Sequence, residues 1–266
     1  MKSASKEEHL RAYYQTLFRA WGRQHWWPAH NRFEVIVGTY LTQNTAWTNV
    51  ELALRSLRKT SLLTIEGIRK VPLPELELLI RSAGYFRQKA RRLKTFVAFL
   101  DENYAGSLSH MFAQPTEKLR EELLALNGIG PETADSILLY AGQHPVFVVD
   151  AYTRRILDRH NILPASVPYE EIRDLFERAL LQTACAQPPP PVRPGRSPAT
   201  SLPRLKSIVR GPAHPPSRMS LARRSSQAQV FNDMHGLIVA VGKHYCSKSR
   251  PKCDECPLRK FLPQLK

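Results

Sequence analysis

Apolar residues recur along most of the chain at intervals of three and four, which is the spacing of amphipathic helices. Residues 7–21 are the clearest case, with Leu10, Tyr14 and Leu17 on one face. The same spacing predicts further helices over residues 33–57, 73–82, 87–99, 117–126, 131–141, 151–160, 169–181 and 230–241. No convincing alternation of apolar and polar residues, typical of a strand, appears. We therefore expect an all-α fold of helix pairs joined by short turns.

Residues 184–226 interrupt this helical pattern. They contain ten prolines, many serines and arginines, and almost no periodic apolar residues. A segment of this composition cannot bury enough apolar surface to offset the entropy lost on ordering it. We expect a disordered insertion between two helices. It is either a basic arm that contacts phosphates or an insertion that the fold tolerates.

The charge of the chain favours a polyanionic partner. The sequence has 39 basic and 23 acidic residues, and its formal net charge is +16. Residues 184–226 hold eight basic and no acidic residues, so they supply +8 and leave +8 for the remainder. Nucleic acid is the first candidate for such a partner. A basic protein without one is the alternative.

The length and hydropathy of the chain limit its class further. With 266 residues, 42% of them hydrophobic, it can bury a core in one large domain or in two lobes. No apolar run reaches the roughly 18 residues that a membrane-spanning helix needs. The N-terminus lacks the apolar core of a signal peptide. We expect a cytoplasmic, nucleoid-associated protein with no membrane partner.

The segment 126–134 (LNGIGPETA) predicts a tight hairpin between two helices. Gly128 and Gly130 permit backbone conformations and close approaches that a Cβ would prevent. Backbone N–H groups at the start of the second helix favour an anion, so the hairpin suits a phosphate. An ordinary helical corner with a glycine cap is the alternative.

Asp150 follows a short apolar run and precedes a helix, so it is a candidate N-cap. A carboxylate at a helix N-terminus stays ionised because the helix dipole favours the anion. Such a carboxylate can stabilise positive charge on a sugar or activate water. Capping and catalysis are compatible at this position.

Three of the four cysteines form a tight group near the C-terminus, and Cys185 stands alone. Cys246, Cys253 and Cys256 have the spacing C-x6-C-x2-C. In a chain without a secretion signal, this grouping favours metal or cluster binding over a disulfide framework.

Together the hairpin, the Val149-Asp150-x4-Arg155 segment and the cysteine tail resemble the endonuclease III superfamily of DNA glycosylases, over roughly residues 34–262. The resemblance implies two helical lobes around a DNA-binding cleft, a helix–hairpin–helix motif and a C-terminal iron–sulfur type loop. The expected boundaries are 1–30 with 142–245 for one lobe, 31–141 for the other, and 246–266 for the loop and tail. In this family the target nucleotide is flipped out of the stack.

The resemblance also assigns roles to individual residues. Asp150 matches the catalytic aspartate, and Gly128, Ile129 and Gly130 match the phosphate-binding hairpin. Glu132 occupies the position at which bifunctional members carry a lysine that forms a Schiff base. A glutamate cannot form one, so we expect a monofunctional hydrolase that leaves an abasic site.

The polar segment 41–45 (LTQNT) within an apolar stretch is a second signature of the family. The resemblance implies that Gln43, with Asn44 beside it, enters the space left by the flipped base. The alternative is a glutamine that faces solvent. Trp26, Trp27 and Trp47 are similar to the aromatic residues of endonuclease-III-type 3-methyladenine glycosylases. Stacking between electron-rich rings favours cationic alkylated purines. Ordinary core tryptophans, and oxidised pyrimidines as substrates, remain alternatives.

The three clustered cysteines match the first three ligands of the family's [4Fe-4S] cluster, which normally takes four thiolates. Leu262 stands at the fourth position. Cys185 or a residue other than cysteine could complete the site. Otherwise the site is vestigial and packing alone holds the tail.

We therefore expect a monomeric DNA glycosylase of base-excision repair that acts on damaged double-stranded DNA. It would need an abasic-site endonuclease downstream. A bifunctional glycosylase/lyase acting on oxidised pyrimidines and a non-catalytic DNA-binding protein are the alternatives.

Overall fold

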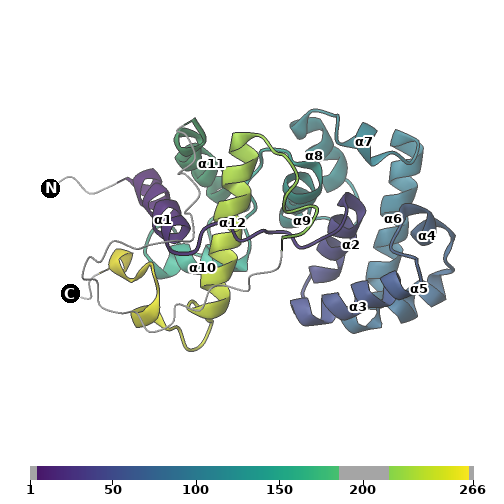
Figure 1. The fold of residues 1–266 in the computed structure, drawn as a ribbon, viewed down its shortest axis with the longest axis horizontal. Coiled ribbons are helices and arrows are strands. Elements are labelled where there is room, and N and C mark those ends of the chain that lie inside the picture. The colour runs from purple at the N-terminus through teal and green to yellow at the C-terminus, as the bar shows by residue number, and fades with distance from the viewer. Residues whose placement is uncertain (1–4, 186–215, 264–266) are drawn as a thin grey trace. The chain divides into compact units, whose positions relative to one another are not determined.

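The computed structural model describes residues 5–185 and 216–263 (Figure 1). Every regular element within these two ranges is a helix, which confirms the predicted all-α fold. The chain divides into two compact units, each described by itself. The terminal unit contains the described residues 5–26, 149–185 and 229–263, and the central unit contains residues 27–148 and 216–228. Among these helices, none is long and apolar enough to cross a membrane.

The terminal unit is built on α1, α10, α11 and α12. Their bounds are Lys6–Trp21, Ala151–Arg159, Tyr169–Cys185 and Ser226–His244, and the short turns η3 (Cys253–Glu255) and η4 (Arg259–Phe261) follow. A capping box formed by Ser5 and Glu8 starts α1. The predicted apolar face of α1 is buried, and α1 packs against α11.

Two glycines of α12 allow other segments of the terminal unit to approach the helix closely. A Cβ at Gly242 would lie 2.2 Å from Cδ1 of Tyr152, so the tyrosine ring occupies the space of a side chain. A Cβ at Gly236 would lie 3.1 Å from the Cβ of Trp26 and 3.2 Å from that of Gln24. The first turn of α10 and the segment after α1 are therefore both packed directly on α12.

The central unit is built around α2 (Arg32–Thr42), in which every residue from Phe33 to Leu41 is buried. Around it lie α3 (Trp47–Lys59), α4 (Ile65–Lys70), α5 (Leu73–Leu79), η1 (Arg81–Ala83), α6 (Phe86–Tyr104), α7 (Leu108–Met111), α8 (Thr116–Leu124) and α9 (Pro131–Ser136). A π-helix, η2 (Ile137–Gly142), continues directly from α9. The predicted helix 33–57 is thus divided into α2 and α3 by a turn at residues 43–46, where the polar residues stand.

A buried lysine fixes that turn. Lys89 of α6 is 1% exposed, and its Nζ donates hydrogen bonds of 2.8 Å to Leu41 O, Thr45 Oγ1 and Ala83 O. Burial, and then the nearby charge of Arg92, lower the pKa of Lys89 to about 8. All three donors of the ammonium group have acceptors, so the end of α2 and the end of η1 are tied to α6.

The structure differs from the sequence-based expectation at residues 216–226, which were expected to belong to a disordered insertion. Ser217 Oγ donates to Trp27 O at 3.1 Å, and Met219 N donates to Ala29 O at 3.1 Å. The Met219 side chain is buried, so this stretch packs on the central unit through a side chain that the helical pattern did not mark. The rest of the expected insertion, residues 186–215, lies outside the described residues.

Candidate functional site

Asp150 is the N-cap of α10, and its two carboxylate oxygens face different groups. Oδ1 accepts from Thr153 N at 2.7 Å and from Thr153 Oγ1 at 2.9 Å. Oδ2 lies 3.6 Å from Nε2 of His235 on α12. The Asp150 side chain is 12% exposed. The hydrogen bonds of the helix cap therefore involve Oδ1 and do not involve Oδ2.

His235 is the titratable side chain beside this second oxygen. It lies in the middle of α12 and is 6% exposed as a side chain. Burial lowers the pKa of His235, and the charge of Asp150 acts against that shift. Sequence reasoning missed this residue because it is one of several polar positions in a buried stretch of α12, and its spacing does not distinguish it from Asn232 and Asp233.

The two glycines of the predicted hairpin have different surroundings. Gly128 has a φ of +82°, and a Cβ there would lie 2.0 Å from Arg92 Nε. Gly130, the N-cap of α9, has a φ of −98°, and a Cβ there would meet nothing within 4 Å. Ile129 between them is buried. Gly128 is thus required by the fold itself, whereas the space beside Gly130 is open to an external group.

Glu132 is exposed at the second position of α9. Because no amine stands at this position, the helix cannot supply the lysine that a Schiff-base mechanism requires.

Gln43 is bound within the central unit. Its Nε2 donates to Gly128 O at 2.9 Å and to Thr133 Oγ1 at 3.0 Å, while its Oε1 accepts from Arg92 Nη1 at 2.8 Å. The side chain connects the turn at 43–46 to the hairpin. The sequence-based role for Gln43, entry into the space left by a base, stays a prediction.

Two exposed side chains stand on neighbouring turns of the central unit. Asn44 has a left-handed backbone with φ 50°, and Tyr85, which is 70% exposed, has φ 46°. Thr45 Oγ1 donates to Ala83 O, and Lys89 bonds to both turns. Tyr85 was missed by sequence reasoning, because an aromatic residue at a helix start usually belongs to the core.

Trp27 and Trp47 do lie together in the central unit, but they do not form an open slot. Their ring centroids are 5.3 Å apart with an interplanar angle of 82°, and the Trp27 ring also packs on Tyr140 at 5.4 Å. Trp27 is buried, while Trp47 is partly exposed and its Nε1 donates to Glu51 Oε1 at 2.9 Å. Because the two rings are close and nearly perpendicular, a base cannot lie between them as they stand.

Trp26 is the last residue of the first segment of the terminal unit. Its ring is buried, and the Nζ of Lys243 lies 5.6 Å from the ring centroid. The terminal unit thus holds Asp150, Trp26 and the cysteine tail, and the central unit holds the remaining candidate residues.

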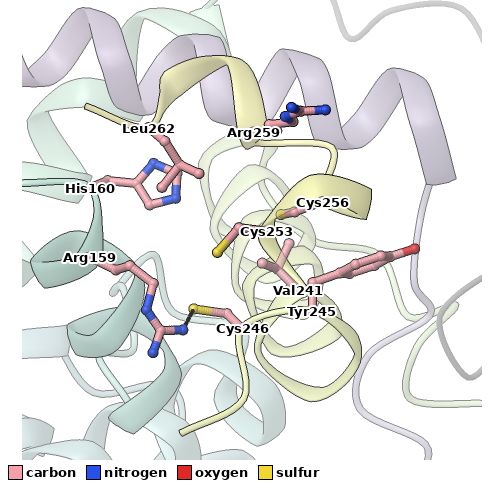
Figure 2. A pocket seen from close by; sticks show the side chains of 9 residues that line it. All are labelled: Arg159, His160, Val241, Tyr245, Cys246, Cys253, Cys256, Arg259 and Leu262. Carbon is pink, nitrogen blue, oxygen red and sulfur yellow. Dashed lines mark hydrogen bonds between the residues drawn. The ribbon is translucent and has the colours of Figure 1, made fainter. Parts of the chain in front are cut away.

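Cys246, Cys253 and Cys256 line one small cavity in the terminal unit, where Arg159 points at Cys246 (Figure 2). The cavity, about 10 Å³, is also lined by Arg159, His160, Val241, Tyr245, Arg259 and Leu262. Burial raises the pKa of Cys256 to about 11, and the neighbouring thiols add to the shift. Arg159 Nη1 donates to Cys246 Sγ at 3.0 Å. The volume suffices for about one water molecule.

These residues do not fit a four-thiolate cluster. Leu262, at the fourth ligand position, lines the cavity, and Nδ1 of His160 lies 2.6 Å from the Tyr13 hydroxyl. The Cys185 side chain lies outside the described residues. In the part of the chain that the structure describes, no three Cys, His, Asp or Glu side chains are placed to hold a metal. The expected iron–sulfur loop is therefore not found among them.

Hydrogen bonds from α10 hold the tail in its place. Arg155 Nε donates to Cys246 O at 2.7 Å, and Arg159 Nη1 donates to Ser247 O at 3.1 Å. These are charge-assisted bonds, which are stronger than neutral ones. The start of the tail is thus fastened to the helix that Asp150 caps.

The profile of the family described as "HhH-GPD superfamily base excision DNA repair protein" matches residues 37–181. Among curated proteins, "Putative DNA repair glycosylase MJ1434" of Methanocaldococcus jannaschii is 36% identical over 97% of this chain and 97% of its own length. An endonuclease III of Thermotoga maritima is 30% identical over 85% of this chain and 80% of its own length.

Two solved structures extend the comparison. The Helicobacter pylori 3-methyladenine DNA glycosylase MagIII, bound to 1,N6-ethenoadenine, has a TM-score of 0.66 at 25% identity, covering 90% of this chain and 98% of that chain. A trapped endonuclease III–DNA covalent intermediate also has a TM-score of 0.66, at 21% identity, covering 97% of this chain and 96% of that chain. The second likeness concerns the fold alone.

We predict that Cys246, Cys253 and Cys256 do not hold an iron–sulfur cluster by themselves, because these three thiols share a cavity of about 10 Å³ with Leu262, which stands at the fourth ligand position. Iron analysis and the visible spectrum test this directly, and a chelator should leave the unfolding midpoint unchanged.

Arg159→Leu should destabilise the protein by about 1–3 kcal/mol, since it removes charge-assisted bonds to the tail.

Arg259→Leu is the matched control for Arg159→Leu, since Arg259 lines the same cavity but pairs with Asp254 at the surface. Its effect on the free energy of unfolding should stay within about 0.5 kcal/mol. Stoichiometric iron that disappears in Cys256→Ser would contradict the expectation.

Proposed function

The chain belongs to the HhH-GPD superfamily of base excision DNA repair proteins, and we propose that it is a monofunctional DNA glycosylase that releases alkylated purines from double-stranded DNA. The observation that carries the proposal is that the two carboxylate oxygens of Asp150 face different groups. Oδ1 is held by Thr153, and Oδ2 is left without a bond from the cap. A fixed carboxylate oxygen of this kind can act on developing positive charge.

The chemistry requires little more than this oxygen and a water molecule. As the N-glycosidic bond breaks, the base leaves with the bonding electron pair and positive charge develops on the sugar. Oδ2 of Asp150 stabilises that charge. Water then forms the new bond to C1′ and gives its proton to Oδ2. A cationic alkylated purine leaves as a neutral base and needs no acid to protonate it.

The described lysines with lowered pKa values support the monofunctional assignment. Lys89 donates all three of its hydrogen bonds within the central unit. Burial also lowers the pKa of Lys94, whose Nζ donates to Arg69 O at 2.9 Å and to Val71 O at 2.5 Å. Neither amine is free to attack a sugar, and Glu132 provides none.

The pairing of an indole with a carboxylate supports a preference for cationic bases. Trp47 is partly exposed, and Glu51 accepts the hydrogen bond of its indole N–H. A carboxylate beside the ring adds negative potential where a cationic base would stack. The likeness to MagIII, a 3-methyladenine glycosylase, points to the same substrate class.

The hairpin and the two exposed turns are the proposed DNA contacts of the central unit. Gly130 leaves open space for a phosphate to approach the backbone at the start of α9. Asn44 and Tyr85 are exposed and held on adjacent turns. We assign entry into the duplex to Asn44 rather than to Gln43, because Gln43 is bound to the hairpin.

We expect Asp150→Asn to reduce release of 3-methyladenine from alkylated DNA by roughly 10²–10⁴-fold. Asparagine caps helices as well as aspartate does, so the fold and the DNA affinity should be preserved. The assay is single-turnover base release, with DNA affinity measured by fluorescence anisotropy.

Two controls accompany the Asp150→Asn assay. Borohydride should trap no protein–DNA adduct; a trapped adduct would show a bifunctional lyase. A wild type that binds DNA but releases neither methylated purines nor oxidised pyrimidines would instead be a non-catalytic binder.

Gly128→Ala and Gly130→Ala should have different effects, the first on the stability of the fold and the second on the affinity for DNA. The alanine at 128 meets Arg92 at a positive φ, so it should destabilise the protein by about 1–3 kcal/mol. The alanine at 130 meets nothing and should change the free energy of unfolding by less than about 0.5 kcal/mol, yet weaken DNA binding. Thermal unfolding and anisotropy measure the two effects. An unchanged DNA affinity in Gly130→Ala would show that the hairpin is not part of the DNA interface.

Glu51→Gln should reduce the preference for cationic over neutral lesions. Glutamine keeps an acceptor for Trp47 Nε1 but removes the negative charge. The ratio of 3-methyladenine to hypoxanthine release should fall by roughly 2- to 5-fold, equivalent to about 0.5–1 kcal/mol. Competition assays on mixed substrates measure this ratio, and an unchanged ratio would show that Glu51 does not contribute to lesion choice.

A further inference from the structure

His235 lies in a buried stretch of α12 that contains both apolar and polar side chains. Met234, Leu237 and Ile238 are buried there, and so are Asn232 and Asp233. A buried imidazole ring costs free energy unless its nitrogens interact with polar groups. Nε2 of His235 lies 3.6 Å from Oδ2 of Asp150.

The geometry at Asp150 leaves one oxygen for this histidine. Thr153 supplies two donors to Oδ1, at 2.7 and 2.9 Å, so Oδ1 is held in place. A separation of 3.6 Å is longer than a hydrogen bond, but catalytic contacts commonly shorten when substrate binds.

The backbone on both sides of this pair is closely packed. The Tyr152 ring fills the space beside Gly242, and Trp26 and Gln24 lie against Gly236, the residue after His235. Neither α10 nor α12 can shift without disturbing these contacts. The distance between His235 and Asp150 is therefore set by helix packing within the terminal unit.

We propose that His235 is the positioning residue of Asp150, whose Nε2–H donates to Oδ2 and fixes the carboxylate against the developing sugar cation. This inference rests on the proposed glycosylase function. Because burial lowers the pKa of His235, the imidazole is neutral near pH 7. A neutral donor orients the carboxylate and leaves it its negative charge.

Two substitutions separate positioning from packing. His235→Gln keeps an N–H close to the position of Nε2, whereas His235→Leu fills the space without a donor. We expect His235→Leu to lower the single-turnover rate of base release roughly 10- to 100-fold, with DNA affinity unchanged. His235→Gln should recover most of that rate. Thermal unfolding of both variants reports any loss of stability.

The outcomes that overturn the proposal are specific. A wild-type rate in His235→Leu would show that the carboxylate needs no partner. Equal loss of rate in both variants, in step with their unfolding midpoints, would show that His235 only packs.

A measurement that does not depend on enzymatic activity tests the pairing of His235 with Asp150 separately from the proposed glycosylase function. In Asp150→Asn, the pKa of His235 measured by NMR should fall, because the carboxylate that opposes the burial effect is gone. An unchanged pKa would overturn the pairing even in an active enzyme. If the wild type releases no base while this shift is observed, the function fails and the pairing stands.

Discussion

The buried ammonium group of Lys89 is the constraint on which the central unit depends. An ionised side chain without acceptors would not be tolerated beneath α2, so two segments far apart in the sequence must present three oxygens at the same point. Leu41 O, Thr45 Oγ1 and Ala83 O do so. The turns that follow α2 and η1 are consequently fixed beside each other, and the exposed side chains that they carry, Asn44 and Tyr85, have defined positions.

In the terminal unit one carboxylate serves both the fold and the proposed chemistry. Asp150 caps α10 through Oδ1, which holds the side chain in one rotamer and makes Oδ2 a fixed charge rather than a mobile one. A charge that needs no reorganisation during the reaction is more effective than one that does. The close contact between Tyr152 and Gly242 then sets where this charge lies relative to α12.

Local patterns were sufficient for most of the helices and for the cap at Asp150, because each depends on residues a few positions apart. They did not predict the short helices α4 and α7, nor the break between α2 and α3. They were insufficient wherever a polar side chain finds a distant partner. Gln43 meets Arg92 and Gly128, and His235 meets Asp150, and no spacing rule connects such positions. The cysteine spacing predicted a cluster, but Leu262 lines the cavity at the fourth ligand position.

The hydrogen bonds of Gln43 make the hairpin and the turn at 43–46 thermodynamically linked. Any force that displaces Gly128 also strains the bond to Gln43, and through it the backbone that carries Asn44. Under the proposed function, a phosphate at the hairpin and a base pair at Asn44 would therefore not be independent ligands. Each would change the affinity for the other by the same factor.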